Sequence, residues 1–136
     1  MKHKPLLMLT RAIMEFNRGN IKESLNALKE MIHENPRSPP DIWFAIGLCH
    51  FRLGKLQKAK FSFDKTIELD PENSMALISL GIVDIKQNIN DFEVRERASK
   101  MFERAFRANP RNPLALKYLA EHYFFQKEFT LAQDLS

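Results

Sequence analysis

The sequence predicts an all-α solenoid of about three and a half helical hairpins, and three observations support this prediction. An Asn-Pro or Asp-Pro pair recurs at Asn35-Pro36, Asp70-Pro71 and Asn109-Pro110. Segments with helical periodicity precede each pair, and small and large apolar residues recur at matching places within them. No segment alternates polar and apolar residues over the length of a strand, so we predict no sheet.

The recurring pairs lie close to the 34-residue period of the tetratricopeptide repeat. Four units follow, at approximately 5–38, 40–73, 74–112 and 113–136, and the last is truncated within its second helix. The second unit matches the repeat pattern best, through Trp43, Ile46, Gly47, His50, Ala59, Phe63 and Pro71. The first matches least well, because Arg11 and Glu15 stand where the pattern has Leu and Tyr.

Small residues are expected where the two helices of a hairpin approach closely. Ala12, Gly47, Gly81 and Ala120 supply one side of this approach, and Ser24, Ala59, Ala98 and Ala132 the other. Large residues are expected to fill the space between hairpins, namely Leu28, Phe63 and Phe102. The proline after each second helix ends that helix.

The third unit is longer than the second. From Gly47 to Ala59 the chain advances 12 residues, whereas from Gly81 to Ala98 it advances 17. We therefore expect five additional residues in the turn between the two helices of this unit, near residues 88–91.

Composition narrows the function classes. Of the 136 residues, 44% are hydrophobic and 28% charged, the net charge is +4, and there is one cysteine. One cysteine excludes an internal disulfide framework and a cysteine-rich zinc site. No apolar run has the length of a membrane span. We expect an intracellular, soluble piece of a longer repeat protein, since Leu131 and Leu135 would otherwise lack a covering helix.

The sequence offers no catalytic constellation. It contains no phosphate-binding loop, no dinucleotide-binding glycine pattern and no His-Glu-x-x-His zinc motif. Cys49 and His50 are adjacent, but the repeat register places both on the buried side of a helix. We interpret them as packed side chains and predict no enzyme, no cofactor and no metal.

The first helices of such repeats line a concave face that binds partners. The positions that face this groove are mostly apolar, and apolar patches usually mark interaction sites. A partner segment in the groove is the favoured interpretation; a register error or a helix of the same protein in the groove is the alternative. The predicted partner-binding residues are Leu9, Ile13, Phe16, Phe44, Leu48, Phe51, Met75, Ile78, Ile82, Ile85, Leu114 and Phe124.

The same positions argue against a chaperone adaptor. Adaptors of this family grip a C-terminal carboxylate with lysine, arginine and asparagine side chains from three successive units. Here Leu9 and Ile13 occupy the first two of those places, and Ala45, Met75 and Ser79 follow. If the clamp positions are aligned one repeat unit further along the chain, the residues found there do not form a complete clamp either.

A basic row is the second candidate surface. Arg97, Lys100, Arg104, Arg107 and Arg111 follow steps of three and four residues, which places them on one stripe of the third unit's second helix. Phosphates or an acidic protein could contact this stripe. A solvated face is the simpler interpretation, because Glu96 and Glu103 offset part of the charge and no aromatic residues for base stacking are interleaved.

Two segments, residues 35–71 and 109–129, go beyond the general repeat pattern. The run Gly-Leu-Cys-His at 47–50 after Pro-Pro-Asp, the expanded third unit, and Leu-Ala-Glu-His-Tyr-Phe-Phe at 119–125 resemble the tetratricopeptide scaffold subunit of the RNA polymerase II-associated factor complex. The resemblance implies a non-enzymatic nuclear scaffold in transcription elongation. It also implies that the repeats hold the namesake and other subunits of that complex, which promotes histone ubiquitylation and methylation.

Overall fold

A computed structural model describes residues 4–121 of the chain. This part contains six labelled α-helices and a further helical stretch at residues 113–121, and no strand occurs within it. The predicted all-α class is confirmed. The chain divides into two compact units, Met1–Pro71 and Glu72–Ser136.

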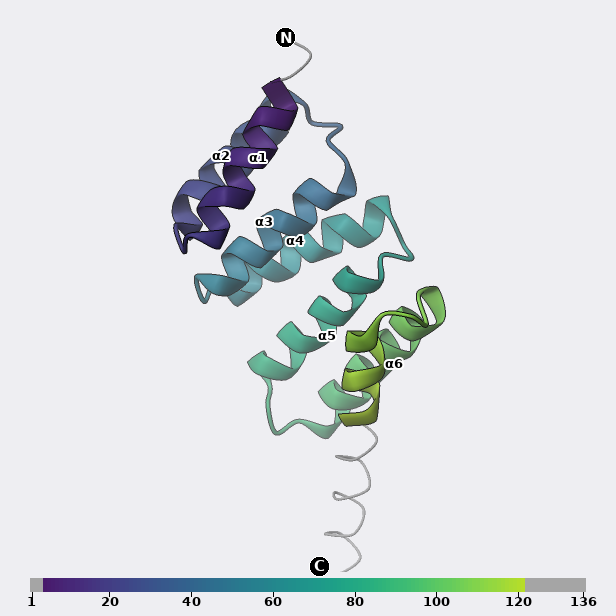
Figure 1. The fold of residues 1–136 in the computed structure, drawn as a ribbon. Helices are drawn as coiled ribbons and strands as arrows, with labels where there is room; N and C mark the ends of the chain where they lie inside the picture. Colours follow the sequence, from purple (N-terminus) through teal and green to yellow (C-terminus); the bar gives the residue numbers. More distant parts are fainter. Residues whose placement is uncertain (1–3, 122–136) are drawn as a thin grey trace, which may run out of the picture. The chain divides into compact units, whose positions relative to one another are not determined.

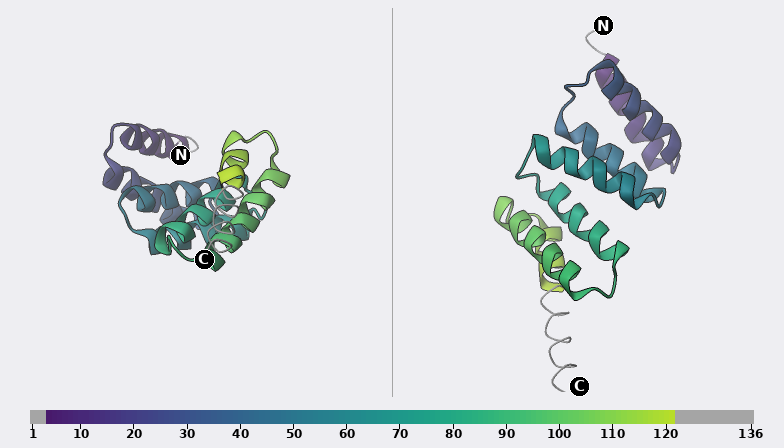
Figure 2. Two further views of the ribbon diagram at one scale, coloured as in Figure 1. Left: turned by 90° about the horizontal axis from the view of Figure 1, so that it is seen from below. Right: turned by 180° about the vertical axis from the view of Figure 1, so that it is seen from behind.

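The first unit contains two helical hairpins. Helix α1 (Lys4–Asn17) packs against α2 (Ile21–Glu34), and α3 (Pro40–Arg52) packs against α4 (Leu56–Leu69), as Figures 1 and 2 show. Helix α2 also packs against α3. Gly19 and Gly54 make the two hairpin turns with φ of 87° and 77°, a backbone conformation that glycine adopts without steric cost.

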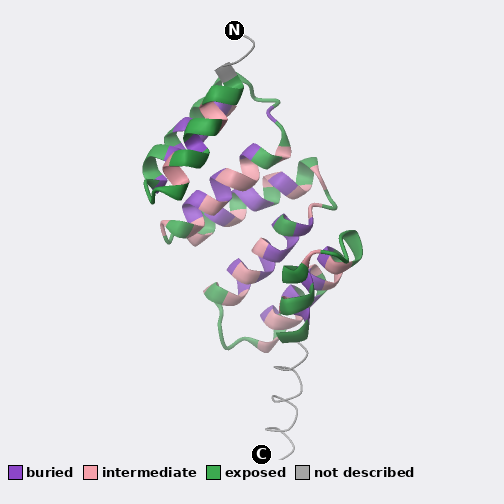
Figure 3. Ribbon diagram, viewed as in Figure 1, coloured by how far each residue is buried: buried purple, intermediate pink, exposed green. Residues whose placement is uncertain are grey.

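The second unit contains α5 (Ser74–Gln87), α6 (Phe92–Ala108) and the helical residues 113–121. Helix α5 packs against α6. The side chain of Asn73 caps α5 by accepting a 3.0 Å hydrogen bond from the backbone N–H of Ala76. Figure 3 shows buried positions recurring between exposed ones along the helices, the pattern expected of amphipathic helices packed on one face.

The prediction that five additional residues lie in the third unit's turn is wrong. The connection at 88–91 is only one residue longer than that at 53–55, and α5 is one residue longer than α3. The remaining three residues extend α6, which has 17 residues against 14 in α4. Asp91 fixes the start of α6, because its Oδ1 accepts hydrogen bonds from the N–H groups of Glu93 (2.9 Å) and Val94 (3.3 Å).

Glycines allow the close approach of helices in two hairpins. A Cβ atom at Gly47 would overlap the ring of Phe63, and one at Gly81 would lie 2.6 Å from the ring of Phe102. Both rings are buried. The two phenylalanines therefore fill space within their own hairpins, and Phe102 also stacks on Tyr118, with ring centroids 5.5 Å apart. The prediction that Phe63 and Phe102 fill the space between hairpins therefore describes only part of their contacts.

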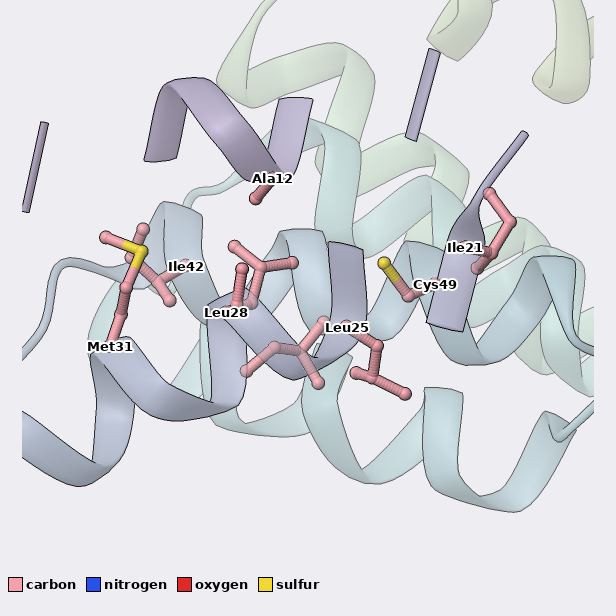
Figure 4. Packing of buried hydrophobic residues seen from close by; sticks show 9 residues of the cluster. Ala12, Ile21, Leu25, Leu28, Met31, Ile42 and Cys49 are labelled. Atoms are coloured by element: carbon pink, nitrogen blue, oxygen red, sulfur yellow. The ribbon is translucent and has the colours of Figure 1, made fainter. Parts of the chain in front are cut away.

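The core of the first unit lies between α1, α2 and α3 (Figure 4). Ser24 joins the helices at the centre, because its hydroxyl donates a 2.7 Å hydrogen bond to the carbonyl of Ala12. The Cys49 thiol donates to Ser24 Oγ at 3.7 Å and is completely buried. Burial raises the pKa of the Cys49 thiol. The thiol is thus packed, as predicted, and its raised pKa keeps it protonated at neutral pH.

Among residues 4–121, no helix is both long and apolar enough to cross a bilayer.

Candidate functional site

The first unit carries an apolar pocket of about 140 Å³ between α1, α2 and α3. Helix α1 forms one wall because residues three and four positions apart lie on one helical face. Four predicted partner-binding residues meet here, namely Leu9, Ile13, Phe16 and Leu48. The other lining residues are Ala12, Asn17, Ser24, Leu28, Ala45 and Cys49.

The pocket has a packed floor and an accessible rim. Its floor includes Ala12, Leu28 and Cys49, which are almost completely buried. Ile13 at the rim is 52% exposed, and Leu9 is half-buried. An apolar hollow with exposed isoleucine beside it gains free energy when another apolar side chain covers it. The geometry therefore suits an apolar side chain of a partner.

One edge of this pocket carries a cation. The guanidinium carbon of Arg52 lies 5.3 Å from the ring centroid of Phe16, in a cation–π contact. Arg52 is exposed, and Phe16 is half-buried. The contact holds the Phe16 ring in place and adds a positive charge at the rim.

Two further predicted residues of the first unit, Phe44 and Phe51, are half-buried. The Phe44 ring packs on Phe63, with centroids 5.6 Å apart, and neither Phe44 nor Phe51 lines the apolar pocket. Phe44 thus contributes to the interior contact of its own hairpin.

The predicted partner-binding residues of the second unit differ in how deeply they are buried. Met75 and Leu114 are each 37% exposed, and Ile82 and Ile85 are half-buried. Ile78 is only 1% exposed, so it belongs to the packed interior and not to the candidate surface. Phe124 lies outside the described residues.

Asn112 positions one of these residues. Its amide nitrogen lies 3.3 Å from the sulfur of Met75 and 3.2 Å from the hydroxyl oxygen of Ser74. The Ser74 hydroxyl donates to the carbonyl of Ala105 at 3.1 Å. This network ties the start of α5 to the end of α6 and to the turn that follows it.

The predicted basic row is exposed, but it is shorter than expected. Arg97, Lys100, Arg104 and Arg107 lie on α6, whereas Arg111 follows the helix end at Ala108 and is not on its stripe. Arg107 pairs with Glu103 at 3.5 Å. An exposed pair of this kind contributes about 0–1 kcal/mol, so its effect is to offset charge.

His50 was predicted as a packed imidazole, and it is 5% exposed. Its Nδ1 is buried without a hydrogen-bond partner. Burial lowers the pKa of His50 below 6.5, and the positive charges of Lys29, Lys58 and Lys55 lower it further. The imidazole is therefore neutral at pH 7. Across residues 4–121, no group of three His, Cys, Asp or Glu side chains is placed to hold a metal ion.

The lowered pKa of His50 predicts acid sensitivity of the first unit. Between the ordinary pKa of 6.5 and the lower folded value, the unfolded chain binds the proton more readily. The free energy of unfolding should therefore fall as pH decreases through about 6.5. Denaturation followed by Trp43 fluorescence at about pH 7.5 and pH 5.5 measures this. His50→Phe should reduce this decrease in the free energy of unfolding, whereas His33→Gln, at an exposed position, should not. An equal decrease in the unchanged chain and in both variants would contradict the prediction.

Two family models of the tetratricopeptide repeat match the chain, at residues 40–73 and 95–134. Together they cover more than half of it, and the chain belongs to the tetratricopeptide repeat family. It is 39% identical over 129 residues to the protein CTR9 homolog of Arabidopsis thaliana. It is 30% identical over 131 residues to the RNA polymerase-associated protein CTR9 of Caenorhabditis elegans.

These matches cover 95% and 96% of this chain but only 12% and 11% of the two relatives. The resemblance to the repeat subunit of the RNA polymerase-associated complex, predicted from the sequence, is confirmed over this span. The first tetratricopeptide domain of Spaghetti (RPAP3), bound to an HSP90 peptide, has the same fold. Its TM-score is 0.79 at 19% identity, over 93% of this chain and 96% of that one. The Arabidopsis OM64 domain gives 0.74 at 16% identity, over 87% and 93%.

Proposed function

We propose that this chain is a non-enzymatic scaffold module whose first unit holds an apolar segment of a partner protein. The observation that carries the proposal is the pocket lined by Leu9, Ile13, Phe16 and Leu48. A large apolar side chain buried there contributes about 1.5–3 kcal/mol, before the costs of association are subtracted. The exposed or half-buried Met75, Ile82, Ile85 and Leu114 supply further apolar contacts in the second unit.

The relatives suggest which partners the module serves. The Caenorhabditis elegans relative is named as an RNA polymerase-associated protein. We infer that this chain acts in the nucleus within the corresponding complex. There it binds the namesake and other subunits of that complex, in transcription elongation and histone modification.

Binding of a C-terminal carboxylate, as in chaperone adaptors, is not favoured. The pocket-lining residues include no lysine, arginine or histidine, and Leu9 and Ile13 occupy places where adaptors carry polar clamp residues. The Arg52 guanidinium lies over the Phe16 ring at the rim. A buried carboxylate in this pocket would lack the charge-assisted hydrogen bonds that it needs.

Affinity capture from nuclear extract tests the proposal, with the bound proteins identified by mass spectrometry. Ile13→Glu places a charge at the pocket, whereas Met14→Glu places the same charge on the same helix at a residue that is 45% exposed and does not line the pocket. The unchanged chain and Met14→Glu should recover subunits of the polymerase-associated complex. Ile13→Glu should recover at least ~10-fold less, since burying an unpaired charge is costly.

Circular dichroism must show that both variants remain helical. Equal recovery by Ile13→Glu and Met14→Glu would contradict the assignment of the pocket. Failure of the unchanged chain to recover any subunit of the complex would contradict the proposed partners.

A further inference from the structure

The first unit carries a second pocket, of about 420 Å³, with walls from α2, α3 and α4. It shares no lining residue with the apolar pocket described above. Basic, aromatic and aliphatic side chains meet in it. The lining residues are Lys29, Ile32, Trp43, Ile46, His50, Gln57, Lys58, Phe61 and Ser62.

The pocket is positively charged. Lys29 comes from α2 and Lys58 from α4, both are exposed, and no carboxylate is among the lining residues. Both lysines act electrostatically on His50. Cations at a concave surface of low polarity attract an anionic group more strongly than isolated surface lysines do.

His50 supplies an unsatisfied polar group at this pocket. It is 5% exposed, and its buried Nδ1 has no hydrogen-bond partner. His50 is therefore a packed polar side chain in the pocket wall, and the charge that could attract a ligand comes from Lys29 and Lys58.

Aromatic side chains form the apolar part of the pocket. The rings of Trp43 and Phe61 meet edge to face, with centroids 6.4 Å apart and planes at 72°. Phe61 is 59% exposed, an unusual exposure for such a side chain, and Ile32 and Ile46 lie beside the rings. Aromatic residues of this kind frequently provide the anchoring contacts of protein interfaces.

We propose that this pocket binds an acidic peptide segment of a second partner protein. A carboxylate side chain of the segment pairs with Lys29 and Lys58, while a neighbouring bulky apolar side chain packs on Trp43 and Phe61. The site is independent of the apolar pocket, so the module can hold two partner segments at once.

A peptide fits these features better than a nucleic acid does. Nucleic-acid binding draws its affinity from many phosphate contacts along an extended basic surface. The pocket instead offers two lysines around a hollow with room for a few side chains, which matches one carboxylate and one apolar residue.

Selection from a displayed library of random peptides of about twelve residues tests the proposal. Selection on the unchanged chain is combined with counter-selection on the Lys29→Glu/Lys58→Glu variant. Enriched peptides should carry Asp or Glu next to an aromatic or large aliphatic residue. A synthetic peptide of that sequence, its Gln-substituted form and an oligothymidylate are then titrated while Trp43 fluorescence is measured.

Affinity for the acidic peptide should fall at least ~10-fold in Lys58→Glu and on Gln substitution of the peptide, because each change removes a charge pair. Lys22→Glu, at an exposed position on α2 outside the pocket, should change affinity by less than ~2-fold. Ile13→Glu should leave this affinity unchanged, which separates this site from the apolar pocket.

Three outcomes would overturn the proposal. Selection could yield no acidic and apolar sequence that is lost on the double variant. Lys22→Glu could weaken binding as much as Lys58→Glu, which would indicate general attraction only. The oligothymidylate could bind this pocket more tightly than the peptide, which would indicate a nucleic-acid site.

Discussion

Phe63→Ala is expected to lower the free energy of unfolding of the first unit by about 3–5 kcal/mol. Phe63 is 1% exposed, and its ring occupies the space that the missing side chain of Gly47 leaves between α3 and α4. It also packs on Phe44. Truncation removes these contacts and leaves a cavity that glycine on the opposite helix cannot fill.

Chemical denaturation followed by Trp43 fluorescence measures this loss in the first unit, since Trp43 is the one tryptophan of the chain. Phe61→Ala provides the matched control, because Phe61 lies on the same helix and is 59% exposed. It should cost less than ~1 kcal/mol. If the two truncations had equal effects, the account of how the hairpin packs would be wrong.

Gly81→Val is expected to destabilise the second unit by about 3 kcal/mol, the upper end of the usual cost of overpacking a core. The Cβ of valine would lie 2.6 Å from the Phe102 ring, which is 1% exposed and stacked on Tyr118. The ring has little room to move, so the helices must separate or the ring must leave its rotamer. The better helix propensity of valine relative to glycine offsets only a few tenths of this cost.

A double-mutant cycle with Phe102→Leu tests the cause directly. If the overlap with the ring produces the loss, Gly81→Val should cost at least ~1 kcal/mol less in the Phe102→Leu background. Unfolding followed by circular dichroism gives the four free energies. Strictly additive costs would show that the ring is not the reason for glycine at this position.

These contacts explain why the all-α fold of helical hairpins could be predicted from the sequence. A small residue recurs opposite a large one because the two helices of each hairpin pack closely in the same way. The turn glycines Gly19 and Gly54 indicate where the chain reverses between those helices. The position of the five additional residues was harder to predict, because a helix extends towards its N-terminus as far as a capping residue allows. Asp91, an N-cap residue just before the helical periodicity of α6, was the available signal.

The candidate site could be predicted in part. Helical periodicity places Leu9, Ile13 and Phe16 on one face of α1, and the structure brings that face to a pocket. Helical periodicity predicts which face of a helix a side chain lies on, but not how far other residues bury it. It therefore could not show that Ile78 is buried. The helix stop at Asn109-Pro110 already indicated that Arg111 lies beyond α6.

The pocket around His50 could not be predicted. The residues that line it lie between positions 29 and 62 on three helices. Whether these residues form a pocket depends on how the three helices pack together. The sequence showed a histidine beside a cysteine on a buried helix face. It gave no sign that the Nδ1 atom would be left without a partner.

The central claim is that a partner segment contacts the apolar pocket of the first unit. Site-specific photo-crosslinking tests it most directly, with benzoylphenylalanine replacing Ile13 in one protein and Met14 in another. After irradiation in nuclear extract, position 13 should crosslink to a subunit of the polymerase-associated complex, and position 14 should do so at least several-fold less, since these crosslinks require direct contact. Equal crosslinking from both positions, or none from position 13 while the complex is still captured, would contradict the claim.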